Sequence, residues 1–159
     1  MAAKKRKLEK DEIEWGEFQL VGISASVSDY TLCFYLNEIL QADFSRIDDH
    51  QLFIKNLDKN VSFRAFQWND EITGVNYMLF NNRSGSNILL PEISGVDCIL
   101  KITGQTDVPK LIAALKNIES VHSAMVLQAM KLKAVVHHLD YYPNTDTEKT
   151  NKTYDENGY

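Results

Sequence analysis

The sequence is poor in cysteine, in long apolar runs and in catalytic motifs, and each shortage excludes a class of protein. Only two of its 159 residues are cysteines, too few for a disulfide framework or a cysteine-based zinc site. Both lie inside apolar runs, Cys33 in TLCFYL and Cys98 in VDCIL, where a buried thiol packs as a small hydrophobic group. The cysteines therefore predict a packing role.

Long apolar segments are also missing. No run approaches the roughly 18 residues that a membrane-spanning helix needs. The first residues, MAAKKRKLEKDEIEW, are charged at the start but lack the apolar segment of a secretion signal. These two absences predict a cytoplasmic protein without a membrane partner.

Recognisable catalytic motifs are absent as well. The chain has no nucleophile elbow, phosphate-binding loop, dinucleotide fingerprint or catalytic triad. Its histidines do not have the HxxxH spacing of a zinc site, and they are His50, His122, His137 and His138. We therefore expect no metal and no cofactor, and we favour a non-enzymatic function.

Charge is distributed unevenly along a chain of ordinary globular composition, with 44 % apolar and 25 % charged residues. Residues 1–7 carry four positive charges and residues 143–159 carry a net charge of −2. Since the net charge of the whole chain is −5, residues 8–142 carry a net charge of −7. An acidic body repels phosphate backbones, which disfavours nucleic acid as a partner. The KKRK run at 4–7 can be a basic targeting or nucleic-acid patch, but a solvated terminal tail is the favoured interpretation.

These patterns predict one domain between two tails. Residues 1–12 are expected to be a flexible charged segment, and residues 143–159 lack the apolar side chains that offset the entropy of ordering. Residues 13–142 are long enough to bury a core. Within them, 128–139 fit either a helical turn followed by an edge strand or one continuous helix.

The first half of the domain combines a strand, a helix and a hairpin. EFQLVGISA (17–25) is apolar on both faces, as an interior strand is. An amphipathic helix of about three turns follows, with Ser26 or Ser28 as its cap and Asp29 at the third position of a capping box. A short strand is expected at 51–55. VSFRAFQW and VNYMLFNN then flank a polar loop ending in Gly74, as in a hairpin.

The second half repeats the strand–helix–strand order. After the loop NRSGSN, VDCILKIT (96–103) alternates apolar and polar residues, and Pro109 fits the first turn of a helix capped by Thr106 or Asp107. SVHSAMVLQ then returns as a strand. The order predicts an α+β two-layer sandwich with two helices on one face of a mostly antiparallel sheet, ferredoxin-like or related.

One motif carries a family resemblance. In LPEISGVDC, the residues Pro91, Glu92, Val96 and Asp97 match the motif of the bacterial IPExxxVDY proteins, with leucine for isoleucine and Cys98 for tyrosine. SDYTLCFYLNEIL and the LKIxG that follows the motif are also similar to that family, over roughly residues 8–140. The resemblance implies no established activity.

Glu92 and Asp97 have two interpretations. A carboxylate pair serves acid–base chemistry or metal binding when both groups converge in a cleft. The favoured interpretation is structural, because no third acid, histidine or cysteine lies at ligand spacing. Pro91 then stops the preceding run, Glu92 accepts backbone N–H groups, and Asp97 closes the loop or faces solvent at the start of the strand.

Two further sets of residues are candidates for binding. The turn Gly104, Gln105 and Thr106 precedes a helix N-terminus, which attracts anions, and it is similar to turns of the amino-acid-binding ACT domains. Ordinary capping is favoured there, because Asp107 brings its own negative charge.

Phe66 and Trp68 share one face of a strand, opposite to Phe63. An aromatic set outside the helix layer needs cover, either by residues 128–140 or by a homodimer. We favour self-association and expect a domain that acts through protein–protein contacts. The alternative is an ACT-like regulatory domain that binds a small molecule at the Gly104–Asp107 turn.

Overall fold

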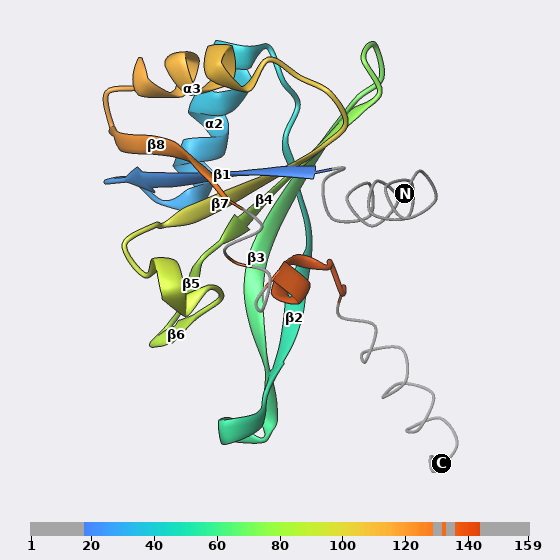
Figure 1. Ribbon diagram of the computed structural model, residues 1–159, viewed down its shortest axis with the longest axis vertical. Helices are drawn as coiled ribbons and strands as arrows, with labels where there is room; N and C mark the ends of the chain where they lie inside the picture. Colours follow the sequence, from blue (N-terminus) through green and yellow to red (C-terminus); the bar gives the residue numbers. More distant parts are fainter. Residues whose placement is uncertain (1–17, 129–131, 133–135, 144–159) are drawn as a thin grey trace, which may run out of the picture.

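A six-stranded sheet with two helices on one side forms the body of the molecule (Figure 1). The computed structural model describes residues 18–128, 132 and 136–143. The strands follow the order β2-β3-β4-β7-β1-β8, and every neighbouring pair is antiparallel. The elements of this body are β1 (Phe18–Ala25), α2 (Asp29–Leu40), β2 (Ser45–Ile54), β3 (Lys59–Asp70), β4 (Val75–Asn81), β7 (Cys98–Thr103), α3 (Val108–Lys116) and β8 (Val121–Leu127). The short strands β5 (Arg83–Ser84) and β6 (Asn87–Ile88) form a separate two-stranded sheet. The predicted α+β fold is confirmed.

The strand order contains two interleaved split βαβ units. Since neighbours are antiparallel, β1 and β4 run in the same direction with β7 between them. In the same way, β7 and β8 are parallel with β1 between them, and α3 connects them. The order β4-β7-β1-β8 is therefore the ferredoxin-like one that the sequence predicts, and β2 and β3 extend the sheet beyond it.

Strand β1 is interior, as its apolar pattern predicts. It pairs with β7 on one side and β8 on the other. Leu20 packs on the face away from the helices, whereas Val21 and Ile23 pack on the helix face. Gly22 faces the same way as Leu20, and a Cβ atom there would meet Val96 Cγ2 at 3.0 Å. A side chain at position 22 would therefore displace the segment that precedes β7.

The β3–β4 hairpin is confirmed, but the expected strand at 51–55 is too short. β2 has ten residues and pairs with β3 along most of its length, with an irregularity between Ile47 and His50. Its sequence, SRIDDHQLFI, mixes charged and apolar residues because much of this edge strand faces solvent. The apolar pattern consequently marked only its last part.

Both helix caps are among the residues predicted for them, but the capping box is not formed. For α3, Asp107 accepts a hydrogen bond from the backbone nitrogen of Lys110 at 3.0 Å, and Pro109 occupies the first turn. For α2, the cap is Ser28, whose Oγ accepts from the backbone nitrogen of Thr31 at 3.2 Å. Asp29 is therefore the first helical residue, and the capping box starting at Ser26 is wrong.

Both faces of the sheet are covered. The helix face packs against Leu32 and Leu36 of α2 and Leu111 and Leu115 of α3. The opposite face packs against other parts of the same chain, namely Leu89, Leu90, Val96, Leu132 and Leu139. Leu132 and Leu139 belong to the C-terminal segment that the sequence offered as a cover. The homodimer stays a prediction.

The C-terminal strap, residues 136–143, lies beside β2 (Figure 1). It begins with a 3-10 turn, Val136–Leu139, and Pro143 forms an isolated bridge with His50. Neither a continuous helix nor an edge strand describes 136–139. Residues 129–131 and 133–135 lie outside the described residues, as do both predicted tails apart from Pro143.

His50 fixes the strap to the sheet. Its ring is buried and contacts Phe80 edge-on and Tyr141 in a stacked arrangement. Nδ1 accepts a hydrogen bond from the backbone nitrogen of Tyr142 at 3.0 Å, and Nε2 contacts the carbonyl oxygen of His138. The imidazole is therefore neutral with its proton on Nε2, and burial lowers the pKa of His50.

Candidate interaction surface

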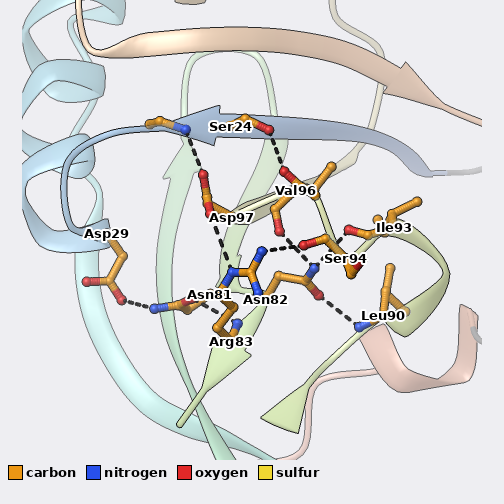
Figure 2. Close-up of polar contacts among 12 residues, drawn as sticks. Ser24, Asp29, Asn81, Asn82, Arg83, Leu90, Ile93, Ser94, Val96 and Asp97 are labelled. Atoms are coloured by element: carbon orange, nitrogen blue, oxygen red, sulfur yellow. Dashed lines mark hydrogen bonds and ion pairs between the residues drawn. The ribbon is translucent and has the colours of Figure 1, made fainter. Parts of the chain in front are cut away.

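Asn82 holds the motif turn together from inside. It is fully buried, and its Nδ2 donates to the carbonyl oxygens of Val96 at 2.9 Å and Ile93 at 3.2 Å (Figure 2). Its Oδ1 accepts from the backbone nitrogen of Leu90 at 2.8 Å. One side chain thus satisfies three backbone groups of the segment 90–96. Sequence reasoning missed Asn82, because nothing in the NNRSGSN run separates a buried asparagine from a loop residue.

Asp97 joins the end of the turn to β1. Its Oδ2 accepts from the backbone nitrogen of Ala25 at 2.9 Å, and Oδ1 lies 3.5 Å from Nε of Arg83. Arg83 also donates to the carbonyl oxygen of Ser94 (Figure 2). Of the two roles predicted for Asp97, these bonds fit closing the loop, although the side chain remains partly exposed.

Glu92 does not share this role. Pro91 opens a short 3-10 turn, Pro91–Ile93, as expected for a residue that stops an extended run. The Glu92 side chain is exposed and makes no hydrogen bond to any part of the chain that the structure describes. The prediction that it accepts backbone N–H groups is therefore wrong. Val96 is buried, whereas Pro91 is exposed.

Asp29 is a buried carboxylate that the sequence pattern placed only as a cap. Its Oδ2 lies 2.9 Å from Nε of Arg64 and accepts from Nδ2 of Asn81 at 2.9 Å. Asn81 Oδ1 in turn accepts from the backbone nitrogen of Arg83 at 3.0 Å (Figure 2). The N-terminus of α2 is thereby tied to β3 and β4, and the network continues to Asp97.

The two thiols lie in the helix-face core, as the sequence predicts. Burial raises the pKa of Cys33 to about 12, with the Asp29 carboxylate adding to the effect, and burial also raises the pKa of Cys98. Thiolate is the reactive form of cysteine. Both side chains therefore serve as packing groups at neutral pH.

The Gly104–Thr106 turn uses its polar groups internally. Gly104 has φ +117°, and a Cβ atom there would lie 3.3 Å from Cα of Val75, so glycine is needed for the backbone. Thr106 Oγ1 accepts from the hydroxyl of Tyr77 at 3.2 Å. Gln105 is exposed. This geometry favours capping over ligand binding.

No metal site is evident among residues 18–128, 132 and 136–143, where no three His, Cys, Asp or Glu side chains gather. Neither described helix has the length and apolar character to cross a bilayer.

Phe66 and Trp68 do not form an exposed face. Phe66 is only 2 % exposed and packs in the helix-face core, below the guanidinium of Arg46. Trp68 stacks on Tyr77 with 4.7 Å between ring centroids and packs against the same core. The surface assignment of Phe66 is wrong, because this strand parity faces the helices and the opposite parity faces the strap.

The exposed apolar surface lies instead on α2. Tyr30 is 71 % exposed and Phe34 56 %, while Tyr35 and Ile39 are more than one-third exposed. We call these four residues the α2 outer face. Phe34 and Tyr35 make an edge-to-face contact with 5.7 Å between centroids. The amphipathic pattern instead predicted a polar side opposite the buried stripe. The available signal was composition, since eight of the twelve residues of DYTLCFYLNEIL are apolar.

A groove of about 700 Å³ adjoins this face, between α2 and the connection from α3 to β8. Its lining is mixed and includes two carboxylates but no cationic side chain. The lining residues are Ser26, Tyr35, Glu38, Ile39, Asn117, Ile118, Glu119 and Ser120. Tyr35 and Ile39 belong to both features, so the groove and the α2 outer face form one continuous surface.

Comparisons with known proteins add no assignment: no protein-family model and no curated protein matches the chain.

Proposed function

We propose that this protein is a non-catalytic domain that acts through protein–protein contact, with the α2 outer face as its contact surface. The observation that carries the proposal is the exposure of Tyr30, Phe34, Tyr35 and Ile39 on one short helix. The outward side of a surface helix is ordinarily polar. A contiguous apolar patch beside a groove is typical of an interaction site.

The remaining chemistry supports a binding function over an enzymatic one. Asp97, which is partly exposed, bonds to the backbone of Ala25 and to Arg83, while Glu92 is exposed and makes no hydrogen bond within the described residues. The ACT-like alternative at Gly104–Asp107 has less support, because Thr106 and Asp107 bond within the fold. We also propose membership of the IPExxxVDY family, on the motif residues Pro91, Glu92, Val96 and Asp97. We propose a cytoplasmic location as well, on the two buried free cysteines.

A photo-crosslinking amino acid at position 34 tests the proposal in producing cells. We expect a discrete crosslinked species from position 34 that disappears when Tyr30 and Tyr35 are changed to serine. Ile72 is the matched control, because it is 95 % exposed but isolated at the tip of the β3–β4 hairpin. Equal crosslinking from positions 34 and 72, or none from either, would contradict a specific contact surface.

A further inference from the structure

We infer that the α2 outer face binds a second copy of this chain, in a two-fold contact of antiparallel α2 helices centred on Phe34. This inference rests on the proposed function, and it specifies the partner. Tyr30, Phe34 and Glu38 are spaced by four residues and are all exposed, so they form one ridge along the helix surface.

Two-fold symmetry makes this ridge complementary to itself. In a symmetric contact the same patch is used by both copies. With Phe34 on the axis, the residue four positions before it lies opposite the residue four positions after it. Tyr30 of each copy therefore faces Glu38 of the other, and the two Phe34 rings meet at the centre.

The chemistry of the facing groups matches. The Tyr30 hydroxyl makes no hydrogen bond within the described residues, and the Glu38 carboxylate lies exposed at the groove. A phenol donates to a carboxylate in a charge-assisted hydrogen bond, and paired phenylalanine rings add a favourable aromatic contact. Each copy thus supplies one donor and one acceptor, and the contact forms two such hydrogen bonds.

Repulsion between the copies is small at this surface. The two Glu38 side chains would lie about eight helical residues, or roughly 12 Å, apart along the contact. That separation exceeds the Debye length of about 8 Å at physiological ionic strength. Asp29, the other acid of α2, is buried against Arg64 and contributes no free charge. The net charge of −5 still opposes association, so the dimer should strengthen as salt is added.

A basic partner is the competing occupant, since Glu38 and Glu119 both line the groove. A basic partner is disfavoured because each ridge offers one hydrogen-bond donor and one acceptor on either side of an uncharged aromatic centre. A basic segment would engage the two carboxylates and leave Tyr30 and Phe34, the most exposed rings of the helix, without a counterpart.

Sedimentation equilibrium of the purified full chain tests the inference. We expect a monomer–dimer equilibrium that Phe34→Lys weakens at least tenfold, since it brings two cations together on the axis. Tyr30→Glu should weaken it about tenfold by placing a carboxylate opposite Glu38. Ile72→Lys, the matched surface control, should leave the dissociation constant unchanged.

The decisive variant is Tyr30→Glu combined with Glu38→Lys. The antiparallel register pairs the new glutamate with the new lysine of the other copy, so dimerisation should return to within about threefold of the original. Both changes suit the helix dipole, with an acid in the first turn and a base in the last, and α2 should remain folded. Failure of the double variant to recover would overturn the register.

The outcomes separate this inference from the proposed function. A chain that stays monomeric up to about 1 mM overturns the second copy as occupant. If the crosslink from position 34 has the mass of a different protein, the contact surface stands and the inference fails. If position 34 gives no specific crosslink and the chain is monomeric, both fail.

Discussion

Helices α2 and α3 cover the same face of the sheet, yet their outward sides differ. α3 buries Val108, Leu111 and Leu115, and its exposed positions include Lys110, Ala113 and Lys116. Such a distribution is sufficient for a helix that covers a sheet, and the exposed positions named carry no large apolar side chain. α2 buries an equivalent stripe of Leu32, Cys33 and Leu36 and still presents two aromatic rings to solvent on its outer ridge.

The two helices are also anchored differently. α3 begins with an exposed cap, Asp107, that bonds to its own first turn. α2 is tied to the sheet through buried Asp29, which bonds to Arg64 on β3 and to Asn81 on β4. A helix held by its neighbours presents its outer side in a fixed position, and such preorganisation lowers the entropic cost of binding. The difference indicates that core formation explains all of α3 but only the inner half of α2.

The largest effects should be equal in the two helices. Leu36→Ala and Leu115→Ala each remove a fully buried leucine from the helix-face core. Each should lower the free energy of unfolding by about 2–5 kcal/mol through lost burial and a remaining cavity. Urea denaturation measures both values. If Leu36→Ala alone cost less than about 1 kcal/mol, α2 would contribute less than α3 to the stability of the core. The two helices could then not be compared as equal covers of the sheet.

Intermediate effects should separate the two anchors. Arg64→Ala leaves the buried Asp29 carboxylate with Asn81 as its remaining side-chain partner, at a cost of about 2 kcal/mol, reduced by the access of water to the half-exposed Arg64 site. Asp107→Ala removes an exposed cap and should cost about 1 kcal/mol. Both are measured by urea denaturation, with Lys110→Ala as a surface control. A larger loss for Asp107→Ala would reverse the assigned order.

The helix stripes could be predicted because their burial repeats with a fixed period, as at Leu111 and Leu115 on one helical face. β1 could be predicted because Leu20, Val21 and Ile23 form an apolar run on both faces, as in a strand buried on both sides. The same reasoning missed most of β2, because Arg46, Asp48 and Asp49 interrupt the pattern of a strand whose pairing with β3 is a tertiary contact.

The candidate surface could not be predicted for a related reason. Apolar periodicity identifies what faces the core, but it assigns Tyr30 and Phe34 to neither side when almost every position is apolar. The same limit applies to β3, where Phe66 and Phe63 lie on opposite faces and periodicity does not show which face is covered. The face of Phe63 is covered by the strap and by Leu89 and Leu90, which are distant in the sequence.

Acid sensitivity is a property in which the two helices should not differ, because neither contains a histidine. It should arise at His50 on the opposite face. Burial lowers the pKa of His50. The hydrogen bond to the backbone carbonyl of His138 and the charge of Asp140 oppose this shift, and the charges of His138 and Lys101 add to it. The unfolded chain therefore takes up a proton near pH 6.5 while the folded chain does not, and the free energy of unfolding falls as the pH drops from above 6.5 toward the lowered value.

Urea denaturation between pH 7.5 and 5.5 measures this dependence. His50→Gln should be less stable at pH 7.5, since the ring contacts with Phe80 and Tyr141 are lost, but its stability should fall less steeply on acidification. His122→Gln, at an exposed position, should keep the original slope. Parallel slopes for the original chain and His50→Gln would show that the strap contact does not titrate as assigned.

The smallest effects on stability are expected from substitutions on the exposed sides of the two helices, and they test whether Phe34 contributes to the folded monomer. Phe34→Lys and Ala113→Lys both place a lysine at an exposed position of a helix, and each should change the free energy of unfolding of the monomer by less than about 0.5 kcal/mol. Measured by urea denaturation at a concentration below dimerisation, both should lie on the original curve. A loss of about 2 kcal/mol or more for Phe34→Lys would mean that the ring packs within its own chain, and its exposure would no longer require a partner. Equal neutrality would mean that the folded monomer does not need the Phe34 ring, just as α3 is stable with alanine at the corresponding exposed position. The proposed contact with a second copy would then account for the exposed ring.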